Sequence, residues 1–259
     1  MVSFTKLVTA ALLSTSTFAA PLNIFQKRSG SKRGAAYKEA SLVSALTNGG
    51  AVSWAYNWNS SPDGDLPPGV SFIPMLWGQK SLDGWSSAVQ SALSSGSKYI
   101  LGFNEPDLPS QANMAVSDAA SLYRENITPY ADQATLMTPA VTNGNAQNQG
   151  LNWMSSFLES CSDCKASVMA IHWYGTDADD FKNHVTSAVT LAQQHGIQEV
   201  WITEFGVNDI SQAASFLLQV LPWLDSQEGV GGYAYFYCAS GYLLDGTGLS
   251  ASGQVYASS

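Results

Sequence analysis

Eight short apolar runs recur along the chain, and most are almost continuously apolar instead of alternating with polar residues. Runs of this kind are typical of strands that are covered on both faces, as in a parallel sheet. The predicted strands span residues 34–37, 51–58, 71–77, 99–104, 134–141, 168–174, 199–204 and 232–238.

Helical patterns fill most of the gaps between these runs. In one of them Trp85, Val89 and Leu93 recur at helical spacing, and Gly96 follows. The predicted helices span residues 83–94, 117–130, 179–195 and 211–221. Because strands and helices alternate, the pattern predicts a parallel sheet with helices packed against it.

Eight strands in this length predict that the sheet closes into a compact (β/α)8 (TIM) barrel, with one domain over residues 34–259. An open doubly wound sheet is the main alternative. Such a sheet normally carries a glycine-rich phosphate-binding turn after its first strand, and residues 34–39 contain none.

The residues before the first strand have the character of a leader. A lysine, an apolar run over residues 7–13 and a group of small residues predict a secretory signal peptide over residues 1–20. Two dibasic pairs, Lys27-Arg28 and Lys32-Arg33, predict a pro-segment over residues 21–33 with two cleavage sites. The alternative is a basic leader that stays attached. Apolar runs are too short to cross a bilayer, so we expect a secreted, extracellular protein.

The leader distorts the charge balance of the chain, whose formal net charge is −9. Five of the 11 basic residues and none of the 20 acidic residues lie before Gly34, which leaves a formal charge of −14 on the rest. Such a surface repels phosphate groups, so nucleic acid and anionic membranes are excluded as partners, whereas neutral sugar is compatible. We expect a monomer.

Three cysteines and two sequons bear on covalent modification. Cys161 and Cys164 predict a local disulfide, because no second Cys/His pair completes a metal site. Cys238 is then unpaired, and we expect it to be buried. Asn59 and Asn126 begin N-glycosylation sequons, which predict a glycoprotein.

Two glutamates end two of the predicted strands. Glu105 ends the fourth and is followed by Pro106, and Glu204 ends the seventh before Gly206. In a closed parallel sheet the carboxyl ends of these strands face each other across one mouth. Two converging carboxylates are the minimum needed to break a glycosidic bond without a metal or cofactor. The alternative is that both are surface glutamates.

The expected chemistry is a double displacement in which Glu204 is the nucleophile and Glu105 the acid/base. Carboxyl groups roughly 5–5.5 Å apart favour this retaining reaction, and a gap of roughly 6.5–9.5 Å favours inversion. His172 and Tyr174 share one face of the sixth strand, so the Tyr174 hydroxyl is available to orient Glu204. A buried structural histidine is the alternative for His172.

Aromatic residues gather at the predicted strand ends, where flat rings suit the apolar faces of sugars. These residues are Tyr37, Trp58, Trp77, Trp173, Tyr235 and Tyr237. We expect two or three rings to contact sugar, above all Trp77, Tyr174 and Tyr235. The polar side chains predicted to bind sugar hydroxyls are Asn57, Asn104 and Gln79. The tryptophans predicted to pack between helix and sheet are Trp85, Trp153, Trp201 and Trp223.

Seven short motifs follow one another along the predicted barrel. They are RGAAY (33–37), WAYNW (54–58), PMLWG (74–78), LGFNEPD (101–107), HWY (172–174), WITEFG (201–206) and YAYF (233–236). Together they resemble glycoside hydrolase family 128, the alkali-sensitive-linkage type of glycosyl hydrolase. The resemblance implies a compact (β/α)8 barrel and retaining hydrolysis of β-1,3-glucan by Glu105 and Glu204. It also implies supporting roles for Asn104, His172 and Tyr174.

The leading hypothesis is therefore a secreted β-1,3-glucanase that acts on cell-wall glucan. We expect endo action, because the short chain leaves little length for loops that would block a groove. One alternative is a wall-associated glucan-binding protein with little turnover. Another is a retaining hydrolase of a different β-linked glycan, because the two-carboxylate chemistry would be the same.

Overall fold

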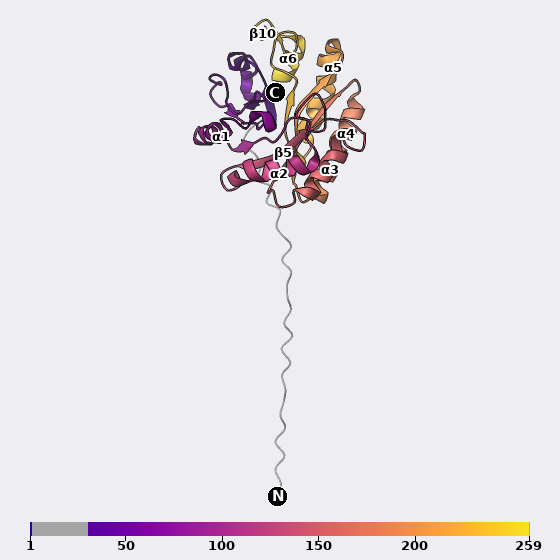
Figure 1. The fold of residues 1–259 in the computed structure, drawn as a ribbon. Coiled ribbons are helices and arrows are strands. Elements are labelled where there is room, and N and C mark those ends of the chain that lie inside the picture. The colour runs from indigo at the N-terminus through magenta and orange to yellow at the C-terminus, as the bar shows by residue number, and fades with distance from the viewer. Residues whose placement is uncertain (2–30, 259) are drawn as a thin grey trace.

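The structure, a computed structural model, describes Met1 and residues 31–258 and contains a main sheet of eight parallel strands (Figure 1). The strand order is β3-β2-β1-β8-β7-β6-β5-β4, so β1 pairs with β8, and every strand pairs with its sequence neighbours except that β3 and β4 lie at the two ends. The strands are β1 (Arg33–Ala36), β2 (Val52–Tyr56), β3 (Ser71–Phe72), β4 (Tyr99–Ile100), β5 (Thr135–Val141), β6 (Val168–Gly175), β7 (Glu199–Val207) and β8 (Val230–Tyr235). All eight predicted strands are present.

Backbone hydrogen bonds just beyond β3 and β4 connect the two ends of this order. The Leu76 amide donates to the Leu101 carbonyl at 3.2 Å, and the Leu101 amide donates to the Pro74 carbonyl at 3.0 Å. The predicted strands 71–77 and 99–104 are longer than β3 and β4, because their second halves form only isolated bridges. The α/β architecture is consistent with the predicted (β/α)8 barrel.

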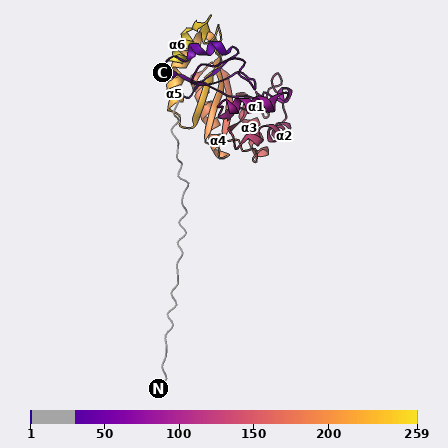
Figure 2. The ribbon, with the colours of Figure 1, turned by 90° about the vertical axis from the view of Figure 1, so that its left-hand side faces the viewer.

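Helices surround the sheet in both views (Figures 1 and 2). The α-helices are α1 (Trp85–Ser94), α2 (Val116–Asn126), α3 (Gly150–Ser160), α4 (Ala178–Gln194), α5 (Ala213–Ser226) and α6 (Ala251–Ala257). The four predicted helices correspond to α1, α2, α4 and α5, whereas no bounds were predicted for α3 and α6. α4 begins where the Asp177 carboxylate accepts hydrogen bonds from the amides of Asp179 and Asp180, which is a typical N-cap.

Not every connection between strands contains an α-helix. Two 3-10 helices join β1 to β2, and residues 57–70, which the structure describes throughout, contain no helix. The 3-10 helices are η1 (Ala40–Leu46), η2 (Asn48–Gly50), η3 (Gln79–Ser81), η4 (Thr128–Tyr130) and η5 (Ile210–Gln212). A small antiparallel pair, β9 (Leu244–Asp245) and β10 (Gly248–Leu249), precedes α6.

The core has two parts, one inside the curled sheet and one between the sheet and the helices. The inner part consists of Ala36, Trp54, Tyr56, Ile73, Met75, Leu101, Met137, Ala140, Val168, Ala170, Trp201 and Ala234. The predicted position of Trp201 is wrong, because its ring packs against Trp54 and Tyr99 at centroid distances of 4.9 and 4.8 Å. Trp85, Trp153 and Trp223 belong to the outer part, as predicted.

The N-terminal boundary of the folded part lies earlier than predicted. β1 begins at Arg33, the last residue of the predicted pro-segment 21–33, and the Arg33 side chain is buried. The predicted signal peptide over residues 1–20, like the Lys27-Arg28 pair, lies outside the described residues. Among the described residues, no helix is long and apolar enough to cross a membrane.

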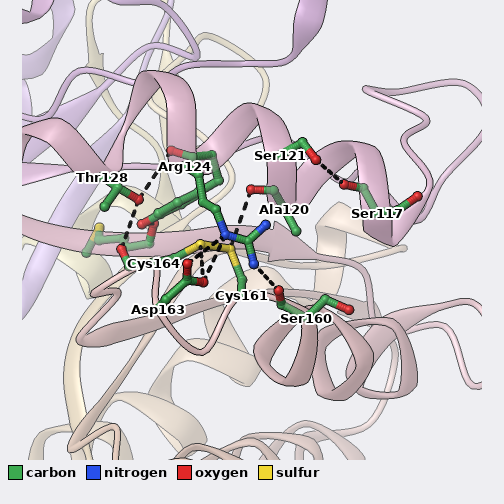
Figure 3. The surroundings of a disulfide bond; sticks show 11 residues. Ser117, Ala120, Ser121, Arg124, Thr128, Ser160, Cys161, Asp163 and Cys164 are labelled. Carbon is green, nitrogen blue, oxygen red and sulfur yellow. Dashed lines mark hydrogen bonds and ion pairs between the residues drawn. A yellow bond between two sulfur atoms is a disulfide. The ribbon is translucent and has the colours of Figure 1, made fainter.

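The predicted disulfide joins Cys161 and Cys164, and Cys238 is a buried free cysteine, as predicted. Figure 3 shows the disulfide beside α2, where the Arg124 guanidinium pairs with Asp163 at 2.9 Å and also bonds the Ser160 carbonyl. The segment after α3 is thus attached to α2 by a charged side chain as well as closed by a covalent bond. Glycosylation of Asn59 and Asn126 remains a prediction.

Gly102 permits a close approach between the fourth and fifth strands. A Cβ atom at this position would lie 2.6 Å from the Pro139 nitrogen and 2.8 Å from the Thr138 carbonyl carbon. Backbone atoms cannot move aside as the end of a flexible side chain can. The glycine therefore sets the position of the segment that leads to Glu105.

We predict that Gly102→Ala destabilises the protein by about 1–3 kcal/mol, because the added methyl group overpacks against backbone. In a domain of this size, that loss lowers the melting temperature by several degrees. The matched control is Gly248→Ala, where the nearest atom to a new Cβ lies at 3.6 Å. Calorimetric measurement of the melting temperatures of both variants tests this prediction. Equal melting temperatures for Gly102→Ala and Gly248→Ala would contradict it.

Candidate active site

The two predicted glutamates meet at one end of the sheet. Glu105 follows the fourth-strand segment and Glu204 lies in β7, and both side chains are buried. One carboxylate oxygen of each glutamate and one ring nitrogen of His172 all lie within 4.8 Å of one another. Strand register contributes to this arrangement, because His172 in β6 is paired directly with Glu204 in β7.

An open cavity of about 540 Å³ gives access to the two carboxylates. Its lining residues are Lys38, Asn57, Trp58, Trp77, Asn104, Glu105, Gln111, Tyr174, Glu204 and Phe236. The volume falls within the range of roughly 300–1,000 Å³ that is typical of ligand sites. Other hollows of about 630 and 760 Å³ are larger, but neither glutamate lines them. We therefore take the smaller cavity as the candidate active site, because it contains the paired ionisable groups.

Three uncharged donors hold the Glu204 carboxylate. The Trp58 indole donates to Oε1 at 2.7 Å, the Tyr56 hydroxyl approaches the same oxygen at 3.3 Å, and the Tyr174 hydroxyl donates to Oε2 at 2.5 Å. Burial and the nearby Glu204 carboxylate raise the pKa of both tyrosines, so both phenols stay protonated and can donate. The predicted contact between Tyr174 and Glu204 is therefore confirmed, and both carboxylate oxygens are fixed.

His172 lies between the two glutamates and is fully buried. Its Nδ1 lies 2.8 Å from Glu105 Oε1, and its Nε2 lies 3.0 Å from Thr203 Oγ1 and 3.5 Å from Glu204 Oε1. Burial alone would lower the pKa of His172, but the Glu204 charge and the hydrogen bond with Glu105 outweigh it and raise the pKa. The ring has no exposed surface, as in the predicted alternative of a buried structural histidine, so His172 does not contact a ligand in the cavity directly. Its contacts instead orient the carboxylates.

The same three residues, Glu105, His172 and Glu204, are close enough together to hold a metal ion. Both nitrogens of His172 already have partners, Glu105 and Thr203. A metal ion would have to replace one of these hydrogen bonds. The arrangement is therefore that of a hydrogen-bonded acid pair, which needs no ion to hold it together.

Backbone geometry at two strand ends aims the site residues into the cavity. Glu105 has a φ of 44° and Trp58 a φ of 61°, values in the left-handed region that residues with side chains rarely adopt. Each such residue costs about 1–3 kcal/mol and persists only where the surroundings hold it. At Glu105 the surroundings are specific, because its amide donates to the Ala140 carbonyl at 2.8 Å.

Asp107 is a buried carboxylate to which the sequence analysis gave no role. It accepts hydrogen bonds from the Thr142 hydroxyl at 2.6 Å and from the Gly150 amide at 2.8 Å. Gly150 is the first residue of α3, so Asp107 connects the loop after Glu105 to the start of that helix. The carboxylate therefore supports the shape of the site and does not line the cavity.

Asn104 lies beside the glutamates, as predicted. Its Nδ2 donates to Gln111 Oε1 at 3.3 Å, whereas its Oδ1 is buried and has no partner among the described residues. A buried acceptor without a partner costs about 1–3 kcal/mol. Asn104 lines the cavity, but this oxygen itself is enclosed.

Two of the aromatic residues predicted to bind sugar line the cavity, and one does not. Trp58 and Trp77 line the cavity and are half-buried. Tyr235 is fully buried on the helix side of β8, where its ring packs against Phe205 at 5.3 Å, so its predicted contact with sugar is wrong. The neighbouring residue, Phe236, lines the cavity instead. Successive strand residues point to opposite faces, so an error of one position in the prediction placed the Tyr235 side chain on the wrong face of the sheet.

The same one-residue error applies to two further predicted aromatics. Tyr37 is fully buried and its hydroxyl donates to the Pro62 carbonyl at 2.6 Å, so its predicted binding role is wrong, and Lys38 lines the cavity instead. Trp173 stacks on Phe216 of α5. Gln79 is exposed in η3 and does not line the cavity.

Five residues of the site were not predicted from the sequence, namely Tyr56, Thr203, Phe236, Lys38 and Gln111. For Tyr56 a signal was present, because it lies two residues before Trp58 and therefore shares its face. Thr203 points to the same side as His172 only because of the irregular register between β6 and β7. No sequence pattern reveals this irregular register.

A family model and a known protein both match most of this chain. A family model described as "Glycosyl hydrolase catalytic core" matches residues 34–256. The chain is 28% identical over 229 residues to Alkali-sensitive linkage protein 1 of Schizosaccharomyces pombe. The match covers 80% of this chain but only 40% of that relative's length.

Solved structures show the same similarity in three dimensions. A GH128 subgroup III curdlan-specific exo-β-1,3-glucanase from Blastomyces gilchristii, in complex with glucose, is 44% identical with a TM-score of 0.82. That match covers 87% of this chain and 97% of the other. A GH128 subgroup I endo-β-1,3-glucanase from Amycolatopsis mediterranei, in complex with laminaritriose, is 26% identical with a TM-score of 0.74 and covers 88% and 99% of the two chains.

We predict that His172 titrates above its ordinary pKa of about 6.5 and that Glu204→Gln lowers the His172 pKa, because the variant removes a nearby negative charge. Since the folded-state pKa is raised, protonated His172 stabilises the fold below the unfolded pKa. That contribution is lost as the pH rises through the folded pKa. Proton NMR of the histidine Cε1 signals measures the shift directly.

His184 is the internal control for this titration. Burial lowers its pKa, whereas Asp180 and a hydrogen bond with the backbone of His172 oppose that change, and Glu204 is not among these causes, so the Glu204 variant leaves the His184 titration unchanged. A His172 signal that titrates at the same pH in the parent and the variant would contradict the electrostatic account.

Proposed function

This chain belongs to glycoside hydrolase family 128, within the glycosyl hydrolase catalytic core, and we propose that it hydrolyses β-1,3-glucan with retention of configuration. The observation that carries the proposal is the pair Glu105 and Glu204, whose nearest carboxylate oxygens lie within 4.8 Å at the base of an open cavity. Such a gap is compatible with the retaining spacing of roughly 5–5.5 Å and supports it over the wider inverting spacing.

Glu204 acts as the nucleophile in the first step. Its carboxylate attacks the anomeric carbon while the protonated Glu105 gives its proton to the departing glycosidic oxygen, and the product is a glycosyl ester on Glu204. The hydrogen bonds from Trp58, Tyr56 and Tyr174 support this role, because they orient both oxygens without supplying a proton.

Glu105 acts as the base in the second step. It takes a proton from a water molecule, the resulting hydroxide attacks the anomeric carbon, and the ester bond to Glu204 breaks. His172 bonds Oε1 of Glu105, and no described residue bonds Oε2. The second oxygen is therefore available to carry the exchanged proton. In this scheme His172 is a positioning residue.

The substrate class follows from the cavity and from the relatives. Trp58 and Trp77 offer partly exposed rings for sugar faces, and Asn57 and Gln111 add polar side chains to the lining of the same cavity. The two similar structures are β-1,3-glucanases, and one holds laminaritriose. These observations support β-1,3-glucan above another β-linked glycan.

The position of attack along the glucan is a separate question. The similar structures include both an exo enzyme and an endo enzyme, so they leave the predicted endo action of this chain untested. Endo action predicts that a hexasaccharide is first cut to di-, tri- and tetrasaccharides. Exo action predicts that a single small product appears from the start.

We also propose that the protein is secreted and acts on cell-wall glucan. Support comes from the apolar run and small residues at the start of the sequence and from the disulfide in the folded part. The chain spans 40% of the curated relative's length, so the activity of that whole protein is not transferred here.

The test of the proposed function is incubation with a linear β-1,3-linked glucose hexasaccharide, with products separated by chromatography. We predict that the parent releases shorter oligosaccharides. Glu204→Gln lowers kcat by at least about 10³-fold, because a nucleophile is lost. Glu105→Gln lowers kcat by about 10²–10⁴-fold, because proton transfer is lost.

The matched control is Glu159→Gln, which alters an exposed glutamate on α3 and leaves kcat unchanged. A parent that binds the hexasaccharide without cleaving it would contradict hydrolysis and favour a glucan-binding protein. Faster cleavage of a 1,4-linked oligosaccharide would contradict the proposed linkage.

A further inference from the structure

The first described residues of the chain hold a buried cationic clamp. The Arg33 guanidinium donates to the Tyr233 hydroxyl at 2.9 Å, the Tyr256 carbonyl at 2.9 Å and the Asp225 carboxylate at 3.1 Å, and also to the Ser258 carbonyl. Only 6% of the residue's surface is exposed. One side chain thus connects β1 with β8, with α5 and with the C-terminal helix α6.

Lys32 adds to this clamp from the neighbouring position. Its ammonium group donates to the carbonyls of Leu224, Asp225 and Gln227 at 3.1, 3.0 and 2.6 Å. These carbonyls lie at the C-terminal end of α5, where a cation both satisfies free acceptors and interacts favourably with the helix dipole. Both basic side chains of the Lys32-Arg33 pair therefore have structural partners.

The backbone around the Arg33–Gly34 peptide bond is equally enclosed. The Lys32 carbonyl accepts from the Tyr233 amide at 2.9 Å and from the Trp54 indole at 3.0 Å. Arg33 is paired with Val52 on one side and with Tyr233 on the other. Gly34 lies against the Trp54 ring, which a Cβ atom would approach to 2.2 Å. No edge of this strand is open to another chain.

An endoprotease that cuts after a dibasic pair must hold the substrate in an extended form and take the basic side chain into its own pocket. Exposed loops satisfy this requirement, whereas a paired strand must first unfold locally. At Arg33 unfolding would break the clamp and remove β1 from both neighbouring strands. Cleavage after Arg33 is therefore blocked as long as the chain is folded.

We propose that Lys32-Arg33 is a structural clamp and not a processing site, so that the folded chain keeps Lys32 and Arg33.

The test is incubation of the folded full chain with a purified serine endoprotease that cuts after Lys-Arg pairs, followed by intact mass and N-terminal sequencing. We expect no new N-terminus at Gly34 in the folded chain. In the same chain unfolded in urea, we expect cleavage after both pairs. Cleavage after Arg33 is at least about 100-fold slower in the folded chain, because it requires opening of β1.

The matched variant carries Lys27→Ala and Arg28→Ala, substitutions that leave every residue of the clamp in place. We expect this variant to stay uncut when folded and to be cut after Arg33 when unfolded. A Gly34 terminus on either folded protein would overturn the proposal. Absence of cleavage after Arg33 in urea would also overturn it, because the protection would then come from local sequence and not from the fold.

Discussion

The structure depends on keeping two acidic groups and an imidazole close together in a buried place. Glu105, His172 and Glu204 have ligand atoms within 4.8 Å of one another, and none of them is exposed to bulk water to any large extent. Charged groups in such surroundings are costly unless hydrogen bonds compensate. Trp58 and Tyr174 supply such bonds to Glu204, so hydrogen-bond donors at the end of the sheet hold the acid pair in place.

The same constraint explains local features that would otherwise weaken the fold. Glu105 and Trp58 adopt left-handed backbone conformations, and Gly102 lies against the backbone of the fifth strand. The left-handed residues turn the chain at the edge of the cavity that their side chains line, and Gly102 allows the segment before Glu105 to pack closely against its neighbour. The buried clamp of Arg33 lies elsewhere in the fold and holds β1 in place. The barrel can tolerate strain at the site because its other parts are well fixed.

The sequence predicted the strand order and the meeting of Glu105 with Glu204, because both follow from eight short apolar runs in series and from the geometry expected of a closed parallel sheet. It failed where a single residue decides the side of a strand, as with Tyr235 and Trp201. Irregular register between neighbouring strands shifts the alternation of faces, and that shift depends on tertiary packing. Contacts such as that of Thr203 with the site therefore could not be predicted.

The most direct test of the central claim is the configuration of the first sugar released. Proton NMR can follow the anomeric signals of the new reducing end before mutarotation mixes them. A double displacement between facing carboxylates predicts that the β-anomer accumulates first and the α-anomer appears only later. An initial excess of the α-anomer would mean single displacement by water, and would contradict the roles assigned to the two glutamates.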